Sequence, residues 1–138
     1  MGYYTQQIVT EKGSEAIART VAKQSTLTFT SIKTGAGKYS IYEISKLSSA
    51  TELKDEKQTF DINLISSNEN TIQLTSVLTN VGVTESYEIC EIGLFAKEND
   101  GEEFLAAISL NAQTPALMPV FDKVPIEMQV GDFLTVSN

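Results

Sequence analysis

The stretch Glu88-Ile89-Cys90-Glu91-Ile92-Gly93-Leu94-Phe95-Ala96 decides the fold of this chain. A polar run, Glu98-Asn99-Asp100-Gly101, and a second apolar run, Phe104 to Leu110, follow it. Asn, Asp and Gly tolerate the positive φ angles of tight turns, so two strand-like runs around them predict a β-hairpin. Gly93 marks a point where the strand bulges or where another backbone comes close. We expect the large apolar side chains of the hairpin to build the core behind Gly93, namely Leu94, Phe95 and Phe104.

One segment has the pattern of a long helix. Thr10 is a favourable N-cap, acidic residues follow it, and Ile17 and Val21 lie four positions apart, so we expect an amphipathic helix over residues 10–23. Gly13 weakens the helix by about 1 kcal/mol relative to alanine, so the first turn begins either directly after Thr10 or at Ser14. Ile41, Ile44 and Leu47 have helical spacing, which predicts a short helix and then a loop within 39–53.

Most of the remaining sequence alternates between apolar and polar residues with the period of β-strands. We expect strands at 26–30, 58–64, 72–78 and 126–136, the last one interrupted at Gly131-Asp132, with loops at 34–37 and 66–70. Three prolines keep 111–125 out of a central strand and predict an extended arm there. Six or seven strands and one good helix predict an α+β fold, a mostly antiparallel sheet or sandwich with the N-terminal helix packed on one face. We expect residues 1–138 to form a single domain.

Composition excludes several classes of function. The 138 residues contain no histidine and one cysteine, Cys90, which removes the commonest general base and any disulfide or multi-cysteine zinc site. A net charge of −8 with a single arginine, Arg19, disfavours binding to nucleic acid. No apolar run approaches the roughly 20 residues that span a bilayer. We therefore expect a protein without catalysis, cofactor, metal, nucleic acid or membrane insertion.

The motifs that could hold a ligand have simpler explanations. Gly35-Ala36-Gly37-Lys38 lacks the spacing of a phosphate-binding loop and favours a strand-ending turn. Glu91, an acid inside an apolar run, either faces solvent or pairs with Lys or Arg. The acidic residues around the hairpin indicate a solvated tip rather than a calcium site, and Cys90 a buried small side chain rather than a reactive thiol. Glu102 and Glu103 are adjacent on a strand, so they cannot flank one bond as a hydrolase requires.

Four large side chains lie in segments that local patterning does not bury. They either anchor an interface with another protein or fold back onto their own domain, and they are Tyr3, Tyr4, Met118 and Phe121.

The order of these motifs resembles a known family. Four features follow one another along the chain: a polar start with Thr10-Glu11-Lys12-Gly13, a strand running into Thr34-Gly35-Ala36-Gly37, a middle hairpin, and Glu91-Ile92-Gly93-Leu94-Phe95-Ala96 with an acidic turn. Together they resemble the N-terminal domain of phage tail-collar fibre proteins. The residues that carry the resemblance most specifically are Gly35, Gly37, Glu91, Ile92, Gly93, Leu94 and Phe95. The family's turn often has an acid between its glycines, where this chain has Ala36, so the resemblance gives no support to a cation site there.

The resemblance implies a structural protein of the virion tail, made in the bacterial cytoplasm by a phage or prophage. It would join the tail fibre to the baseplate by non-covalent assembly, with copies of itself, commonly as a trimer, and baseplate proteins as partners. Family members continue into a shaft and a receptor-binding tip, so a sequence ending at Asn138 is either the anchoring part or a short adaptor. The alternative is a receptor- or carbohydrate-binding β-sandwich module that acts as the adhesin itself. Such a module requires exposed aromatic side chains in a cleft.

Overall fold

The predicted hairpin lies at the centre of the molecule. The computed structural model describes residues 8–68, 71–111, 115–121 and 127–135. Strand β7 (Glu91–Glu98) pairs antiparallel with β8 (Phe104–Leu110), and Asn99 supplies the positive φ of the turn, 53°. The first strand of the hairpin begins at Glu91 rather than at Glu88, because Cys90 separates β7 from a different strand, β6 (Tyr87–Ile89).

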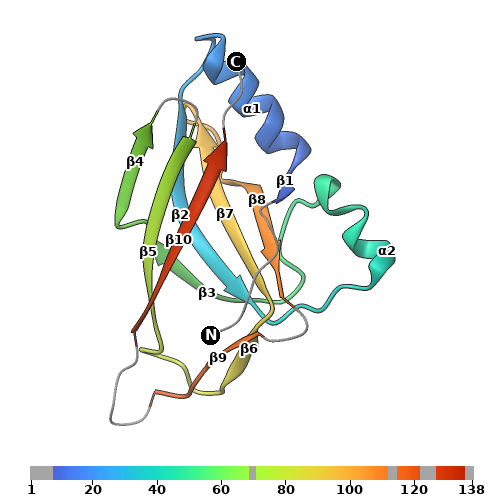
Figure 1. The fold of residues 1–138 in the computed structure, drawn as a ribbon, viewed down its shortest axis with the longest axis vertical. Helices are drawn as coiled ribbons and strands as arrows, with labels where there is room; N and C mark the ends of the chain where they lie inside the picture. Colours follow the sequence, from blue (N-terminus) through green and yellow to red (C-terminus); the bar gives the residue numbers. More distant parts are fainter. Residues whose placement is uncertain (1–7, 69–70, 112–114, 122–126, 136–138) are drawn as a thin grey trace.

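The described strands form antiparallel sheets (Figure 1), which confirms the α+β class. The largest has five strands in the order β1-β8-β7-β2-β3, where β1 is Ile8–Val9, β2 is Leu27–Gly35 and β3 is Glu56–Asp61. A three-stranded sheet has the order β10-β5-β4, where β10 is Glu127–Thr135, β5 is Thr71–Thr79 and β4 is Leu64–Asn68. Strand β9 (Ala116–Met118) pairs with β6 in a two-stranded ribbon.

Strand pairing corrects several expected boundaries. Strand β2 continues through Thr34 and Gly35, which were expected in a loop, because Gly35 still pairs with Glu91. The expected strand 58–64 is broken after Asp61, and the expected turn at 66–70 is strand as far as Asn68, where β4 pairs with β5. Strand β10 is continuous through Gly131, which pairs with Thr75. Long-range partners therefore determine these boundaries more than local turn residues do.

Helix α1 (Glu11–Val21) packs on one face of the five-stranded sheet, as predicted. Thr10 is its N-cap and accepts a hydrogen bond from the Gly13 amide at 3.0 Å. The Thr10 hydroxyl also donates to the Leu105 carbonyl of β8 at 2.7 Å. A Cβ at Gly13 would overlap the Ala106 carbonyl, so glycine lets the first turn lie against β8 and the helix begins at Glu11 rather than at Ser14.

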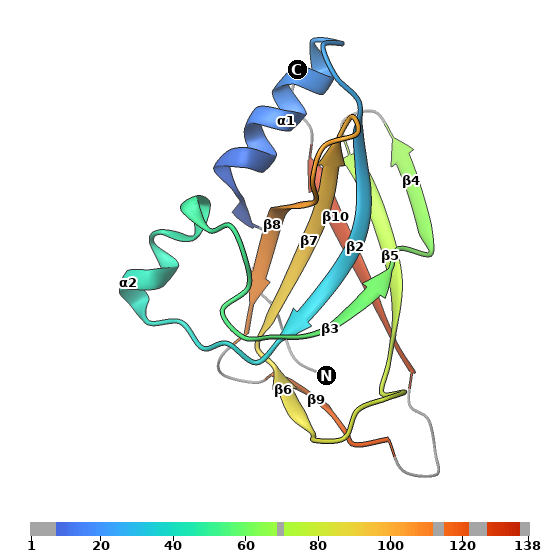
Figure 2. The same ribbon diagram turned by 180° about the vertical axis from the view of Figure 1, so that it is seen from behind.

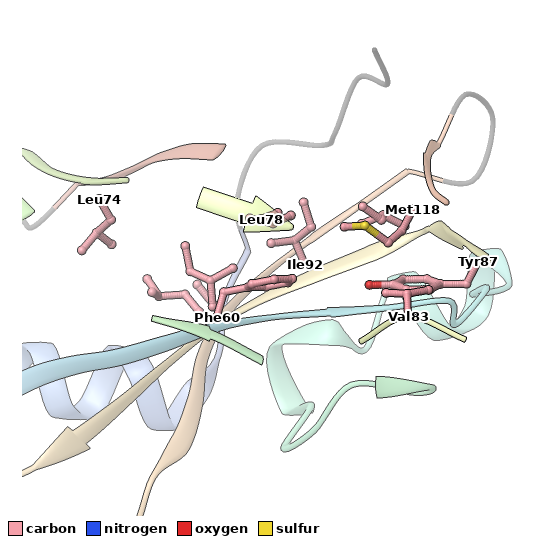
Figure 3. Packing of buried hydrophobic residues seen from close by; sticks show 11 residues of the cluster. Phe60, Leu74, Leu78, Val83, Tyr87, Ile92 and Met118 are labelled. Carbon is pink, nitrogen blue, oxygen red and sulfur yellow. The ribbon is translucent and has the colours of Figure 1, made fainter. Parts of the chain in front are cut away.

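The core occupies both faces of the five-stranded sheet. Toward the three-stranded sheet, Ile92 and Leu94 of β7 pack with Leu74 and Leu78 of β5 (Figure 3). On the opposite face, Phe95 joins a second cluster whose buried members are Leu47, Leu53, Phe95, Leu105, Ile108 and Leu110. Leu94 and Phe95 are core residues as predicted, whereas Phe104 is only partly buried.

Gly93 makes room for side chains rather than for a second backbone. A Cβ there would lie 2.9 Å from both Leu105 Cδ1 and Leu53 Cδ2, and 3.0 Å from Phe95 Cε1. The register shift between β7 and β8 falls after Gly93, between Leu94 and Phe95. The expectation of a bulge or a backbone approach at Gly93 is therefore wrong. Because Gly93 has no side chain, Leu53 and Leu105 of the second cluster can pack directly over the strand at this point.

Candidate functional site

A buried carboxylate lies at the start of β7. The Glu91 side chain is fully buried, and each of its oxygens accepts two hydrogen bonds. Oε1 accepts from the Tyr39 hydroxyl at 2.5 Å and from the Lys54 amide at 2.8 Å. Oε2 accepts from the amides of Gly37 and Asp55, each at 2.8 Å. Glu91 therefore neither faces solvent nor pairs with a Lys or Arg side chain, and that expectation is wrong: three backbone amides and the Tyr39 hydroxyl satisfy the charge instead.

Gly35 and Gly37 provide the space for this carboxylate. A Cβ at Gly35 would lie 2.5 Å from both Glu91 Oε2 and the Asp55 carbonyl oxygen. A Cβ at Gly37 would overlap the same carboxylate oxygen and lie 2.6 Å from Lys54 Cβ. The two glycines and Glu91, which carry the sequence resemblance, thus form one structural unit.

Glu91 closes the base of a long excursion from the sheet. Gly37 and Tyr39 lie at one end of residues 38–53, which we call the α2 loop, and Lys54 and Asp55 lie just beyond the other end. Burial, and then the hydrogen bond to Glu91, raise the pKa of Tyr39, so its hydroxyl stays a donor at neutral pH. The carboxylate thus clamps both ends of the loop to β7, an arrangement we call the Glu91 clamp.

The α2 loop exposes apolar side chains at its tip. It contains α2 (Ile41–Ile44), which Ser40 and Glu43 cap reciprocally, and the 3₁₀ helix Leu47–Ser49. Leu47 is buried in the second cluster, whereas Ile41 is 77% and Tyr42 80% exposed. In both views α2 projects from the side of the five-stranded sheet (Figures 1 and 2). The helical spacing predicted the short helix but not this exposed surface. The sequence signal for it was that Ile41 and Tyr42 are adjacent, so one buried stripe of the helix cannot cover both side chains.

A second exposed apolar surface lies at the end of the molecule where β6 and β9 run. The Asn80 side-chain amide donates to the Val120 carbonyl at 3.2 Å, and the Phe121 amide donates to the Val83 carbonyl at 2.9 Å. These bonds hold the segment after β9 against the chain that leads into β6. We call the exposed apolar residues at this end the end patch: Val81, Leu117, Val120 and Phe121.

The predicted interface residues have separate locations. Met118 is fully buried in the core with Val83 and Tyr87 (Figure 3), so for this residue the alternative of folding back onto its own domain holds. Phe121 is 40% exposed and belongs to the end patch. Tyr3 and Tyr4 lie outside the described residues. The predicted arm at 111–125 contains β9, which pairs with β6 over Tyr87–Ile89.

The other candidate chemical groups are part of the scaffold. Cys90 is buried, and burial raises the pKa of its thiol. Glu103 accepts hydrogen bonds from Thr30 and Ser31 and pairs with Lys33. Within the described residues, no three His, Cys, Asp or Glu side chains converge on a metal site. No helix in the same part of the chain is long and apolar enough to cross a membrane.

The comparison with family models decides the family. The model of the phage tail-collar fibre protein, N-terminal, matches residues 1–118. The chain belongs to this family. Comparisons with curated proteins and with solved structures gave no match. The family is structural and places the protein in the virion tail.

Proposed function

We propose that this protein attaches a phage or prophage tail fibre to the baseplate by non-covalent assembly. The observation that carries the proposal is the family match over residues 1–118. Two exposed apolar surfaces on a strongly acidic chain support it, because exposed apolar patches commonly mark contacts with other proteins. The partners are copies of the same chain and baseplate proteins, and the chain is made in the bacterial cytoplasm before it joins the virion tail.

The Glu91 clamp suits a part that must hold its shape while it bears load. Each carboxylate oxygen receives two donors, and the donors come from both ends of the α2 loop. A loop fixed in this way loses little conformational freedom when a partner binds, and such preorganisation increases affinity. The role of Glu91 in this proposal is therefore to position the surface, with binding left to the apolar side chains.

Co-sedimentation with tails tests the attachment. Purified protein is mixed with tail particles that lack fibres, and separately with host cells, and bound protein is measured after centrifugation. We expect saturable binding to tails, none to cells, and weaker binding for Phe121→Ser. Val21→Ser, at an exposed position on α1 outside both surfaces, is the matched control and should bind as the wild type. Binding to cells and not to tails would contradict attachment and support the adhesin alternative.

A further inference from the structure

The α2 loop makes its regular hydrogen bonds within itself. Its backbone bonds join one turn to the next, as where the Ile44 amide donates to the Ser40 carbonyl at 3.0 Å. Among the backbone bonds of the described residues, none joins residues 40–50 to a strand of the sheet. At the base of the loop, the Ala36 amide donates to the Asp55 carbonyl at 2.9 Å, where the pairing of β2 with β3 ends. The loop can therefore lift away about this base without breaking a ladder between strands (Figures 1 and 2).

Apolar packing holds the middle and the end of the loop on the sheet. Leu47 and Leu53 are buried in the second cluster, together with side chains of β7 and β8. Gly93 leaves the room for Leu53, because a Cβ at Gly93 would lie 2.9 Å from Leu53 Cδ2. An exposed hydrogen bond of 3.3 Å from the Ser49 hydroxyl to Glu11 also joins the loop to α1. Lifting the loop would bare part of the second cluster to water, so the closed state is the favoured one.

The Glu91 clamp couples the release of one end of the loop to the release of the other. Gly37 and Tyr39 donate to the buried carboxylate from one end, and Lys54 and Asp55 donate from the other. If one end left alone, the carboxylate would lose half of its donors while the other end still covered it. A buried charge with unmade hydrogen bonds is costly. If both ends leave, water replaces all four donors, so the state with one end released is disfavoured.

We propose that the α2 loop opens and closes on the sheet as one cooperative unit, with Glu91 as its latch. Opening releases both ends of the loop from the carboxylate and withdraws Leu53 from the space over Gly93. The β7–β8 hairpin and α1 stay folded while this happens. The inference concerns the protein by itself, so it holds or fails independently of attachment to the baseplate.

Amide hydrogen exchange of the full chain, followed by NMR, tests whether the two ends open together. The Gly37 and Asp55 amides lie at opposite ends of the loop and both donate to Glu91 Oε2. We expect these two amides to exchange with one common free energy of opening, smaller than that of the amides in the β7–β8 ladder. Two different free energies would overturn the coupling of the ends. Exchange of both amides only with the ladder would overturn the separate opening of the loop.

Removal of one donor tests the latch. Tyr39→Phe deletes the hydroxyl that donates to Glu91 Oε1 and keeps the ring. We expect the Gly37 and Asp55 amides, which bind the other oxygen, to exchange at least about tenfold faster, by the same factor at both ends, while the β7–β8 ladder keeps its protection.

Tyr42→Phe is the matched control, because Tyr42 lies on the same loop with 80% of its surface exposed, and it should exchange as the wild type does. Faster exchange at Gly37 with no change at Asp55, or no change at either amide in Tyr39→Phe, would overturn the proposal. Either result would leave attachment to the tail unaffected.

Discussion

Glu91 shows how one side chain can hold a long loop in place. Four donors from Gly37, Tyr39, Lys54 and Asp55 surround a carboxylate that has no access to solvent. A buried carboxylate is tolerable only when its hydrogen bonds are complete, and hydrogen bonds to a charged acceptor are stronger than neutral ones. The same donors would lose their partner if the carboxylate were removed, so the arrangement is sensitive to a single substitution.

Glu91→Ala should lower the free energy of unfolding by about 3 kcal/mol or more, because it leaves buried donors without an acceptor. Urea unfolding followed by circular dichroism measures the change. Glu88→Gln is the matched control, since Glu88 is exposed and its ion pair with Lys38 is long, 3.8 Å; we expect a change within about 0.5 kcal/mol. Equal stability of Glu91→Ala and the wild type would refute the clamp.

Gly93→Val should destabilise the protein by about 1–3 kcal/mol through overpacking and reduce soluble expression. The added side chain meets Leu53 and Leu105 at 2.9 Å, and both belong to the second core cluster. Gly93→Ala should cause a smaller loss. A valine variant with the wild-type urea midpoint would show that the space over Gly93 is not filled as described.

At the scale of elements, local sequence patterns predicted what local physics determines. The N-cap at Thr10, the Asn99–Gly101 turn and the alternating burial of β5 from Leu74 to Leu78 all appear as expected. The contacts of Glu91 could not be predicted, because Tyr39 lies 52 positions away and the other donors are backbone amides with no side-chain signal. The surface of α2 was likewise hidden, since the burial of Leu47 but not of Ile41 depends on where the loop folds back on the sheet.

Helix α1 is joined to the end of β7 by an ion pair that should make stability depend on pH. Hydrogen bonds from Arg19 and then Ser25 lower the pKa of Glu98 from 4.5 to about 2. A carboxyl with a lowered pKa in the folded state stabilises the protein above its unfolded pKa, and this contribution is lost as pH falls toward the folded value. The contribution of Glu98 should therefore be complete above about pH 4.5 and absent below about pH 2.

Thermal unfolding of the wild type and Glu98→Gln across this range measures that dependence. We expect the wild type to melt at a higher temperature than the variant at pH 6, and the difference to shrink as the pH is lowered from 5 to 2. Comparing the two proteins at each pH cancels the titration of the other acids. Because the ion pair is solvent-exposed, added salt should also reduce the difference. A difference that stays constant with pH would exclude this pairing as its cause.

At the scale of the whole molecule, the fold presents two separate groups of exposed apolar side chains on a framework of antiparallel strands. One face of the five-stranded sheet packs against the three-stranded sheet, and the other carries α1 and the α2 loop. The class of this framework and its family could be predicted from the sequence, since hairpin, cap and glycine motifs are local. The sequence could not predict which apolar residues remain exposed. Neighbours in a strand face opposite sides, and local pattern does not say which side of β9 meets the core, where Met118 is buried and Leu117 is exposed.

Electron microscopy of tail particles from the producing strain tests the central claim, attachment at the baseplate, most directly. An antibody raised against this chain is coupled to gold and applied to the particles. The account predicts gold clustered at the baseplate end of the tail. Particles without label, together with gold on host cells that were exposed to the purified protein, would contradict attachment and identify the chain as an adhesin module.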